Sequence, residues 1–560
     1  VGSEMCIRDR TLYDENDACT DKNTQRIGLR TLTVSREKDQ WGEEFCFINN
    51  GVKLFAMGAN YIPKDQIVTR CNEEKTRKLL ADCKAANYNF IRVWGGGYYP
   101  DEYFYDYCDE NGIIVWQDFM FACSAYLLTE EFEETVRGEV RDNVIRLRNH
   151  PSLGLWCGNN EIESAWEYWG LPEDEEAKRD YLIIFEDIIP QVLKAYDPCE
   201  NTFYWPSSPS SGGGFKDASS NHAGDMHYWD VWHNFKPIEA FREFYYRFCS
   251  EYGFESLPDI KTCRAFADET KGDFDLCSPV MAAHQKCVQG NEKIMYYLAQ
   301  MVRYPYDFKQ LIYSSQLVQA DCIRSNVEHM RRARGRCMGS AYWQVNDSNP
   351  VISWSSIDYF GRWKGLHYYA KRFYAPCLIS CDDTHRKKPV LNISNERMTA
   401  FEGIVKWTLR NNKAEILQSG EKSVNVPALT AQNVLTIDLS DELKNRTDPR
   451  EKYLEYSIME NGKVLSFGTT LFVRPKEFTF LEPAITYGIS ESEDKFALTF
   501  CAENYAKSVC LSLKTADCVF SDNWFDIHGK EPVTIMIDKA SLSRKMTAQE
   551  LSEELEIMHN

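Results

Sequence analysis

Two glutamates that follow short apolar runs could together perform acid–base and nucleophilic chemistry. Glu161 closely follows LGLWCGN at residues 153–159, and Glu251 directly follows YRFCS at residues 246–250. Retaining hydrolysis of a glycosidic bond needs two carboxyl groups about 5 to 5.5 Å apart, because one protonates the leaving oxygen while the other attacks the anomeric carbon. Either glutamate alone could be a helix cap or an exposed loop carboxylate, but the pair at the ends of two apolar runs favours this chemistry.

Around these glutamates, short apolar runs alternate with helical stretches such as 72–86 and 128–149. That alternation predicts a parallel sheet wrapped by helices. Eight runs are expected to be strands: 54–59, 88–94, 112–118, 153–159, 202–206, 223–228, 246–250 and 337–343. This count favours a (β/α)8 TIM barrel over an open doubly wound sheet, and no strand is followed by GxGxxG. Glu161 and Glu251 then lie at the C-terminal ends of strands four and seven, where such barrels build their active sites.

The part of the chain after the barrel predicts further domains, so the whole is expected to be a multidomain α/β plus all-β protein. After about residue 380, strands alternate with turns as in β-sandwiches, and FVRPKEF carries a proline between two sets of strands. A charged amphipathic stretch at 540–558 predicts a terminal helix. We therefore expect a catalytic TIM barrel at 41–380, an immunoglobulin-like β-sandwich at 381–475, and a C-terminal immunoglobulin-like β-sandwich with a terminal helix at 476–560.

The front of the chain predicts the end of another domain. Residues 11–40 contain an alternating strand pattern and are expected to end an immunoglobulin-like β-sandwich domain, and 44–57 predicts a hairpin that turns at Asn49-Asn50-Gly51. The first ten residues, VGSEMCIRDR, lack an initiating methionine and a signal-peptide pattern, so we interpret residues 1–10 as a non-native leader. On this interpretation the natural N-terminus, with any targeting signal, precedes the sequence.

Composition excludes several classes of partner. The formal net charge of −20 repels phosphate backbones, so a nucleic acid partner is not expected. No apolar run reaches the roughly 18 residues of a membrane-spanning helix, so we expect no membrane insertion. The 20 cysteines include no CxxC pair, and several lie in apolar runs, which favours free thiols in the cytoplasm. Sequons at Asn346, Asn392 and Asn445 are compatible with chance, and a lysosomal or secreted location is the alternative. Nothing in the sequence specifies an oligomeric state.

Seven ordered strings at strand ends make the interpretation specific. With Asn160-Glu161 after strand four and Glu251-Tyr252-Gly253 after strand seven, the chain resembles the retaining hydrolases of glycoside hydrolase family 2, and its β-mannosidases in particular. The resemblance covers residues 41 to 380, and its strings are GANYIP (58–63), RVWGGGYYP (92–100), WQDFMFAC (116–123), WCGNNE (156–161), GDMHYWDVW (224–232), SEYGFES (250–256) and YWQVND (342–347). The front departs from the family, because the leading sugar-binding-like sandwich has no counterpart.

The resemblance implies catalytic roles that the chemistry also supports. Glu161 is expected to be the acid/base and Glu251 the nucleophile. Burial beside the charged Glu251 should raise the pKa of Glu161 by desolvation and like-charge repulsion, and that pKa should fall once Glu251 becomes an ester. Asn160 matches the asparagine that family members use to bond the sugar 2-hydroxyl.

Other strand-end side chains are expected to bind the sugar or to orient the carboxylates. Trp94 and Trp343 could stack on apolar sugar faces, and the hydroxyl of Tyr228 could hold Glu251. Core packing is the alternative role for each of them. The full set consists of Asn60, Arg92, Trp94, Asp118, His227, Tyr228 and Trp343.

No metal or organic cofactor is expected. His222, His227, His233 and Asp225 lie close in the sequence, but neither their spacing nor the resemblance supports a metal site.

The expected function is removal of terminal β-linked mannose from non-reducing ends of β-mannoside oligosaccharides by double displacement. A β-galactosidase or β-glucuronidase is the nearest alternative, and a uronic acid would need a cation, for which Arg92 is the obvious strand-end candidate. A non-catalytic carbohydrate-binding protein on a barrel scaffold is the alternative from another class, since a fold alone does not imply activity.

Overall fold

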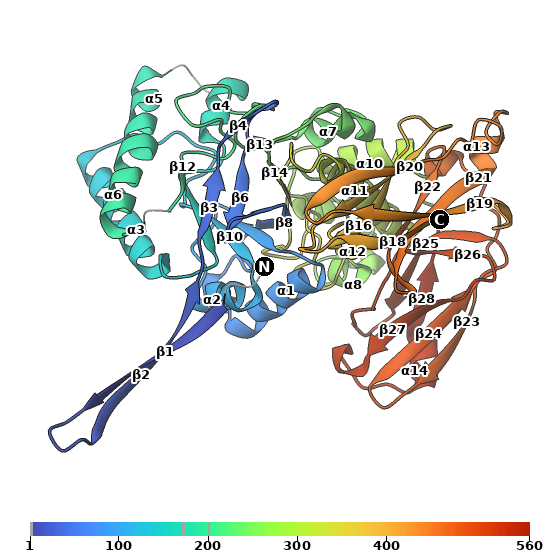
Figure 1. Ribbon diagram of the computed structural model, residues 1–560. Helices are drawn as coiled ribbons and strands as arrows, with labels where there is room; N and C mark the ends of the chain where they lie inside the picture. The colour runs from blue at the N-terminus through green and yellow to red at the C-terminus, as the bar shows by residue number, and fades with distance from the viewer. Residues whose placement is uncertain (1–3, 171–173, 200–201) are drawn as a thin grey trace. The chain divides into compact units, whose positions relative to one another are not determined.

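The computed structural model describes residues 4–170, 174–199 and 202–560 (Figure 1), and the chain divides into two compact units. Each unit combines segments that are distant in the sequence. The first consists of Val1–Trp229, Phe244–Tyr252 and Gly335–Val345, and the second of Asp230–Glu243, Gly253–Arg334 and Asn346–Asn560.

An eight-stranded parallel sheet forms the centre of the first unit. Its strands are β8 (Ala56–Tyr61), β9 (Phe90–Val93), β10 (Ile114–Asp118), β11 (Leu153–Cys157), β12 (Tyr204–Trp205), β13 (Met226–His227), β14 (Cys249–Glu251) and β15 (Gly339–Tyr342). They lie in the order β12-β11-β10-β9-β8-β15-β14-β13. This is the circular order of a TIM barrel in which β12 and β13 are the two edges. The predicted barrel architecture is therefore confirmed, with one strand inside or overlapping each of the eight expected runs.

Small antiparallel strands close the base of this sheet. They are β3 (Leu32–Ser35), β4 (Lys38–Asp39), β5 (Gly42–Glu43), β6 (Cys46–Asn49) and β7 (Val52–Leu54). The predicted hairpin is present, because Asn49 pairs with Val52, and Asn50 and Gly51 adopt the positive φ values of 51° and 79° that such a tight turn requires. Phe45 and other buried side chains of this region pack against apolar residues of the barrel strands.

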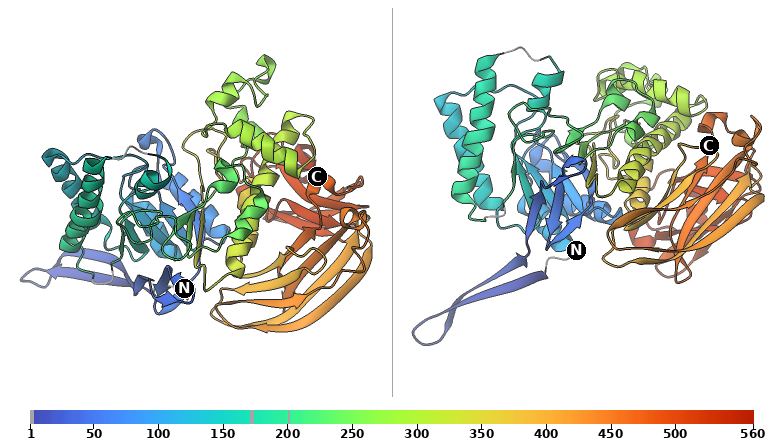
Figure 2. Two further views of the ribbon diagram at one scale, coloured as in Figure 1. Left: turned by 90° about the horizontal axis from the view of Figure 1, so that it is seen from above. Right: turned by 45° about the horizontal axis from the view of Figure 1, so that its top comes forward.

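Helices cover the sheet of the first unit. They are α1 (Glu73–Ala85), α2 (Glu102–Asn111), α3 (Glu130–Leu147), α4 (Ile162–Tyr168), α5 (Glu175–Leu182) and α6 (Ile189–Tyr196), with the short η1 (Val68–Arg70) and the π-helical η2 (Ile183–Ile188). Asn72 and Thr129 begin α1 and α3, because their side chains accept hydrogen bonds from the free backbone N–H groups of the first turn. Helix α3 packs beside α6, as the teal helices of Figure 2 show.

The second unit begins with helices and ends in β-sandwiches. Its helices are α7 (Asp230–His233), η3 (Ile238–Glu243), α8 (Ile260–Cys263), η4 (Glu269–Lys271), α9 (Pro279–Ala283), α10 (Gly290–Met301), α11 (Phe308–Arg332), α12 (Gly365–Phe373), α13 (Asp448–Glu451), η5 (Pro475–Glu477), η6 (Lys539–Ser541) and α14 (Ala548–Glu554). None of the helices in the described part of the chain is long and apolar enough to cross a membrane.

Two pairs of antiparallel sheets form the sandwiches, as expected for immunoglobulin-like domains. The first pair contains β16 (Cys377–Asp382), β17 (Val390–Asn395), β18 (Phe401–Asn411), β19 (Ile416–Val426), β20 (Thr430–Thr436), β21 (Lys452–Glu460) and β22 (Lys463–Leu471). The second contains β23 (Thr486–Glu491), β24 (Lys495–Cys501), β25 (Tyr505–Leu513), β26 (Phe525–His528), β27 (Val533–Asp538) and β28 (Leu555–Met558). The predicted terminal helix is shorter than expected, because it begins only at Ala548 and because residues 555–558 pair with β25 as a strand.

A long hairpin forms the start of the described chain. Strand β1 (Glu4–Tyr13) pairs with β2 (Cys19–Leu29), and the described side chains of the hairpin are mostly exposed (Figure 1). The division into domains, with a non-native leader at 1–10 and the end of a sandwich at 11–40, stays a prediction.

Candidate active site

The predicted acid Glu161 lies where β11 turns into α4. Its backbone has a φ of 62°, an uncommon conformation for a residue with a side chain, and its N–H donates to the carbonyl of Ser208 at 2.7 Å. Gly158 permits this turn, because a Cβ there would lie 2.3 Å from the carbonyl oxygen of Pro206. This strained backbone directs the Glu161 side chain toward the C-terminal edge of the sheet. Strain of this kind is often found at functional sites.

The predicted nucleophile Glu251 is the last residue of β14. Its carbonyl accepts a hydrogen bond of 2.8 Å from the N–H of Tyr228, and its side chain is only 5% exposed. The side chain of Glu161 is 13% exposed. Both carboxyl groups are thus largely out of water at the same end of the parallel strands.

The structure brings the two carboxyl groups together around His227. Nδ1 of His227 lies 2.7 Å from Oε1 of Glu161 and 3.5 Å from Oε2 of Glu251. An oxygen of each glutamate and a nitrogen of His227 all lie within 4.8 Å of one another. The two carboxyl groups are thus close neighbours at the same end of the sheet.

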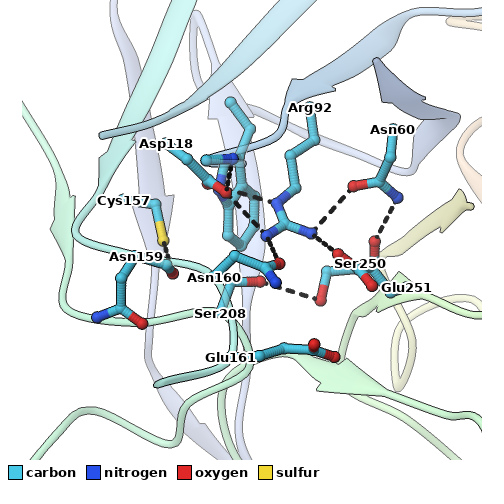
Figure 3. Close-up of polar contacts among 12 residues, drawn as sticks. Asn60, Arg92, Asp118, Cys157, Asn159, Asn160, Glu161, Ser208, Ser250 and Glu251 are labelled. Carbon is cyan, nitrogen blue, oxygen red and sulfur yellow. Dashed lines mark hydrogen bonds and ion pairs between the residues drawn. The ribbon is translucent and has the colours of Figure 1, made fainter. Parts of the chain in front are cut away.

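Arg92 on β9 holds several members of the site together, as Figure 3 shows. Its Nη1 donates to Glu251 at 2.6 Å and to Asn60 at 3.0 Å. Its Nη2 donates to Asp118 at 2.9 Å and to Asn160 at 2.6 Å, and Nε contacts Asp118 at 3.4 Å. A guanidinium has five N–H donors, so protein acceptors occupy all of them. Arg92 therefore orients Glu251 and its neighbours, and it has no donor to offer a sugar.

Asn60 and Asp118 are buried supports of the same network. Asn60 donates from Nδ2 to the carbonyl of Ser250 at 2.9 Å, while its Oδ1 accepts from Arg92. Asp118 also accepts from Nε1 of Trp116 at 2.8 Å and from a backbone N–H. Both side chains are fully buried. Of the two predicted roles, orienting the carboxylates fits these residues, and contact with a sugar hydroxyl does not.

Asn160 is placed for direct contact with a ligand beside Glu161. Arg92 fixes its carbonyl oxygen, which leaves the amide Nδ2 next to Sγ of Cys123 at 3.4 Å. The same sulfur lies 3.6 Å from Oε2 of Glu161. The amide is thus held in one orientation next to the acid, as the predicted bond to a sugar hydroxyl requires.

Trp94 and Trp343 form an aromatic corner after β9 and β15. Their ring centroids lie 5.1 Å apart at 73°, and both side chains are partly exposed. A partly exposed edge-to-face pair leaves an apolar surface of the kind that stacks on sugar rings. Tyr228, by contrast, is buried, and its ring packs against Phe244 and Tyr246.

Burial sets the protonation of the pair. It raises the pKa of Glu161 to about 7, against the opposing effects of Arg92, Cys123 and Asn160. Burial also raises the pKa of Glu251, to which the like charge of Glu161 adds. Arg92 touches Glu251 directly, and its positive charge favours the ionised form of Glu251 over that of Glu161. Burial is thus the main cause of the raised pKa of Glu161, and like-charge repulsion acts on Glu251.

The histidine cluster considered from the sequence does not assemble among the described residues. His222 lies 3.0 Å from the carbonyl of Trp41, and His233 lies 3.4 Å from Nζ of Lys293. His227 instead shares a group with Glu161 and Glu251 whose spacing could suit a cation. Arg92 already supplies the positive charge there, and an ion would displace the proton that an acid needs.

Sequence reasoning missed Ser208 and Cys123 and considered Asp225 only as a metal ligand. Ser208 follows β12 and contacts both Asp225 and His227. The signal that could have found it is its position at the C-terminal end of the fifth strand, where barrel enzymes place functional side chains.

Family models match the two sandwich regions. A Mannosidase Ig/CBM-like domain matches residues 388–477, and an Ig-fold domain matches residues 480–560.

Curated relatives match most of the chain. Beta-mannosidase B of Aspergillus terreus is 32% identical over 94% of this chain and 66% of its own length, and that of Neosartorya fischeri is 35% identical over 90% and 62%. The chain thus spans slightly less than two thirds of the length of these relatives.

Solved structures share the fold. Beta-D-mannosidase from Dictyoglomus thermophilum has a TM-score of 0.88 and 31% identity, covering 98% of this chain and 65% of its own. An exo-chitosanase of Amycolatopsis orientalis has a TM-score of 0.75 at 16% identity, covering 100% and 68%, which shows a shared fold alone. These matches show that the chain is similar to β-mannosidases over most of its length, which agrees with its resemblance to glycoside hydrolase family 2.

Proposed function

We propose that the chain is the catalytic part of a retaining exo-β-mannosidase that removes terminal β-D-mannose from the non-reducing ends of β-mannoside oligosaccharides. The observation that carries the proposal is the buried pair of Glu161 and Glu251, whose oxygens approach within 4.8 Å while Arg92 pairs with only one of them. The arrangement favours one protonated and one charged carboxyl group, which is what double displacement requires.

In the first step, an oxygen of Glu251 attacks the anomeric carbon, and the bond from that carbon to the leaving oxygen breaks. The proton of Glu161 moves to the leaving oxygen, so the aglycone departs as a neutral alcohol. The amide of Asn160 is placed to bond the sugar 2-hydroxyl, and Trp94 and Trp343 to stack on the ring.

In the second step, Glu161 is a carboxylate and takes a proton from water while that water attacks the anomeric carbon. The ester bond to Glu251 breaks, and Glu251 recovers its charge beside Arg92. Two inversions at the same carbon give net retention.

The choice of mannose rests on the names of the relatives and on the environment of Arg92. A β-glucuronidase would need a positive group for the sugar carboxylate, and Arg92, the candidate from the sequence, is fully buried and occupied by protein acceptors. β-Galactosidase activity and non-catalytic carbohydrate binding are left as outcomes of the tests.

Aryl glycosides distinguish these functions. We expect hydrolysis of an aryl β-mannoside with retention, detected by NMR as initial release of β-mannose, and much slower turnover of the matching galactoside and glucuronide. Higher kcat/KM on either of those sugars would reject the mannosidase proposal.

A mechanism-based label tests the nucleophile. A 2-deoxy-2-fluoro mannosyl fluoride should attach to a single peptide that contains residues 246–254, and Glu251→Gln should prevent both labelling and turnover. A label on Glu161, or turnover by Glu251→Gln, would contradict the assignment, and binding without turnover or label by the unaltered protein would favour a carbohydrate-binding role.

A further inference from the structure

A chain of hydrogen bonds reaches Glu161 from a buried carboxylate on the far side of His227. Oδ2 of Asp225 lies 2.6 Å from Oγ of Ser208, which lies 3.0 Å from Nε2 of His227. The other ring nitrogen, Nδ1, lies 2.7 Å from Oε1 of Glu161. Asp225 and Ser208 are fully buried, so water does not compete for these bonds.

The donors around Asp225 determine the direction of the first bond. Its Oδ1 accepts from Nε1 of Trp205 at 2.8 Å and from the N–H of Ser210 at 3.0 Å. Its Oδ2 lies 2.5 Å from Oγ of Ser250 as well as next to Ser208. Two of these partners are N–H groups that can only donate, and a carboxylate with four close partners acts as acceptor throughout. Ser208 therefore gives its single proton to Asp225.

The direction then passes through the histidine. Because the hydroxyl proton of Ser208 points to Asp225, its lone pair faces Nε2 of His227, and Nε2 must carry a proton. Burial lowers the pKa of His227 to about 4, so the ring is neutral near pH 7 and its second nitrogen has no proton. Nδ1 is therefore an acceptor, and the hydrogen atom in its short contact with Glu161 belongs to the carboxyl group.

We propose that Asp225, Ser208 and His227 are positioning residues that keep the proton on the acid Glu161 by presenting it with an acceptor nitrogen. The inference rests on the proposed function of Glu161 as acid/base. It assigns no contact with the sugar to these three residues.

The same arrangement serves both steps of the reaction. An acceptor at Nδ1 stabilises the protonated acid before the first step, because it bonds only the neutral form of the carboxyl group. After proton transfer, the lone pair of Nδ1 faces the carboxylate of Glu161. This unfavourable contact makes Glu161 a stronger base toward the water of the second step.

The other groups that face Glu161 do not replace this effect. Arg92 acts on Glu161 through its charge, whereas Glu251 is paired with Arg92. The thiol of Cys123 is 3.6 Å away, which makes it a weak partner. His227 has the shortest contact with the acid.

Asp225→Asn tests the direction of the chain with little change in shape. The new amide would donate to Ser208, whose proton would turn to Nε2, and His227 would then carry its proton on Nδ1 and donate it to the carboxylate of Glu161. The pKa of Glu161 should fall by about one pH unit, because one hydrogen bond then favours the charged carboxylate of Glu161 in place of its protonated form. Because the acid must be protonated, the alkaline limb of kcat/KM on β-1,4-mannobiose should move to lower pH by that amount, with a roughly tenfold loss above it.

Two comparisons make the result specific. The leaving group of 2,4-dinitrophenyl β-mannoside needs no proton. On this substrate, Asp225→Asn should keep most of the rate of the first step, which forms the glycosyl-enzyme. Ser250→Ala removes a hydroxyl from the same oxygen of Asp225 without touching His227, so its alkaline limb should stay in place. An unmoved limb in Asp225→Asn, or equal losses on both substrates, would overturn the proposal.

A measurement without substrate separates this inference from the proposed function. In the full chain labelled with 15N-histidine, the resonances of His227, assigned by their loss in His227→Gln, should show a protonated Nε2 and a bare Nδ1 near pH 7. Asp225→Asn should exchange the two patterns. A proton on Nδ1 of His227 in the unaltered protein would reject the proposed role of Asp225, Ser208 and His227, whatever sugar the enzyme hydrolyses. The expected tautomer in a protein without mannosidase activity would reject only the proposed function.

Discussion

At the scale of single residues, the two glutamates differ through their nearest neighbours. Both are buried, and both have raised pKa values. Glu251 lies against a guanidinium, whereas Glu161 lies against a neutral imidazole. We propose that a single cation placed on one side of the pair divides the roles of acid and nucleophile between chemically identical side chains.

Glu161→Ala separates acid catalysis from binding. We expect measurable turnover of dinitrophenyl β-mannosides, whose leaving groups need no proton, and a loss of about 100-fold or more on mannobiose, the usual contribution of a general acid. Azide should accelerate the variant on the aryl substrate, because a small anion can enter the vacated space and attack the intermediate without base assistance. Equal losses on both substrates, with no effect of azide, would show that Glu161 only binds or supports the fold.

Arg92→Lys tests whether the arginine orients the nucleophile. A lysine cannot bond Glu251 and Asp118 in the same planar geometry, so we expect kcat to fall by about 100-fold with little change in KM. Weaker pairing raises the pKa of Glu251, and because Glu251 must be charged, the acidic limb of kcat/KM should move to higher pH. Arg146→Lys on the surface of α3 is the matched control. A raised KM at unchanged kcat would mean instead that Arg92 binds the sugar.

At the scale of elements, loops at the C-terminal ends of the strands position the chemistry. The turn after β9 illustrates how closely backbone and side chain are matched. A Cβ on Gly96 would lie 1.9 Å from Cη2 of Trp94, so the indole lies directly against the glycine backbone. Gly96 is exposed, so its missing side chain makes room for the indole of Trp94 and is not needed for packing of the core.

Gly96→Ala should displace the indole of Trp94 and weaken sugar binding. We expect KM to rise by about tenfold, the equivalent of ~1.4 kcal/mol, with a smaller effect on unfolding because the site is exposed. Gly138→Ala in α3 is the control, since a Cβ there meets no atom within 4 Å, and it should leave KM unchanged and slightly stabilise the helix. Unchanged KM in Gly96→Ala would argue against a role of Trp94 in the sugar site.

At the scale of the whole molecule, all cysteines whose side chains the structure describes are free thiols. Many are buried, and burial raises the pKa of such groups, as for Cys337 at about 12. A buried thiol with a raised pKa is a poor nucleophile, because the thiolate is the reactive form. In the described part of the chain, stability therefore rests on packing and hydrogen bonds.

Thiol reactivity and reducing agents test this description. We expect dithiothreitol to leave the melting temperature unchanged, and a thiol reagent to modify the native protein first at its exposed cysteines, while the unfolded chain should react at all 20. Mass spectrometry of the labelled peptides identifies the sites. A fall in melting temperature on reduction would reveal a disulfide and argue for an oxidising compartment. Among the described cysteines, the exposed ones are Cys19, Cys123, Cys199 and Cys277, and Cys123 should react last of these because burial raises its pKa to about 12.

The sequence determined the architecture because its signals are local or periodic. Eight apolar runs alternating with helical stretches specify a barrel, and the Asn49-Asn50-Gly51 turn specifies a hairpin through the backbone conformations that those residues tolerate. Strand ends meet at one edge of a parallel sheet, so the positions of Glu161 and Glu251 in the pattern were enough to predict that they lie close together. The terminal helix was predicted too long, because it begins only at Ala548 and residues 555–558 pair with β25, a partner that no local pattern reveals.

Only the tertiary structure decided what each site residue can do. Arg92 could have been a ligand for a sugar, but acceptors from four different elements or loops occupy its donors. Two of these acceptors, Asn60 and Asp118, are themselves buried. Ser208 is recognised as part of the site only in the folded structure, where it lies between Asp225 and His227. The sequence specifies which groups stand at strand ends, whereas hydrogen-bond direction and burial depend on contacts between segments far apart in the chain. Those contacts determine that Arg92 pairs with Glu251 and that His227 contacts Glu161.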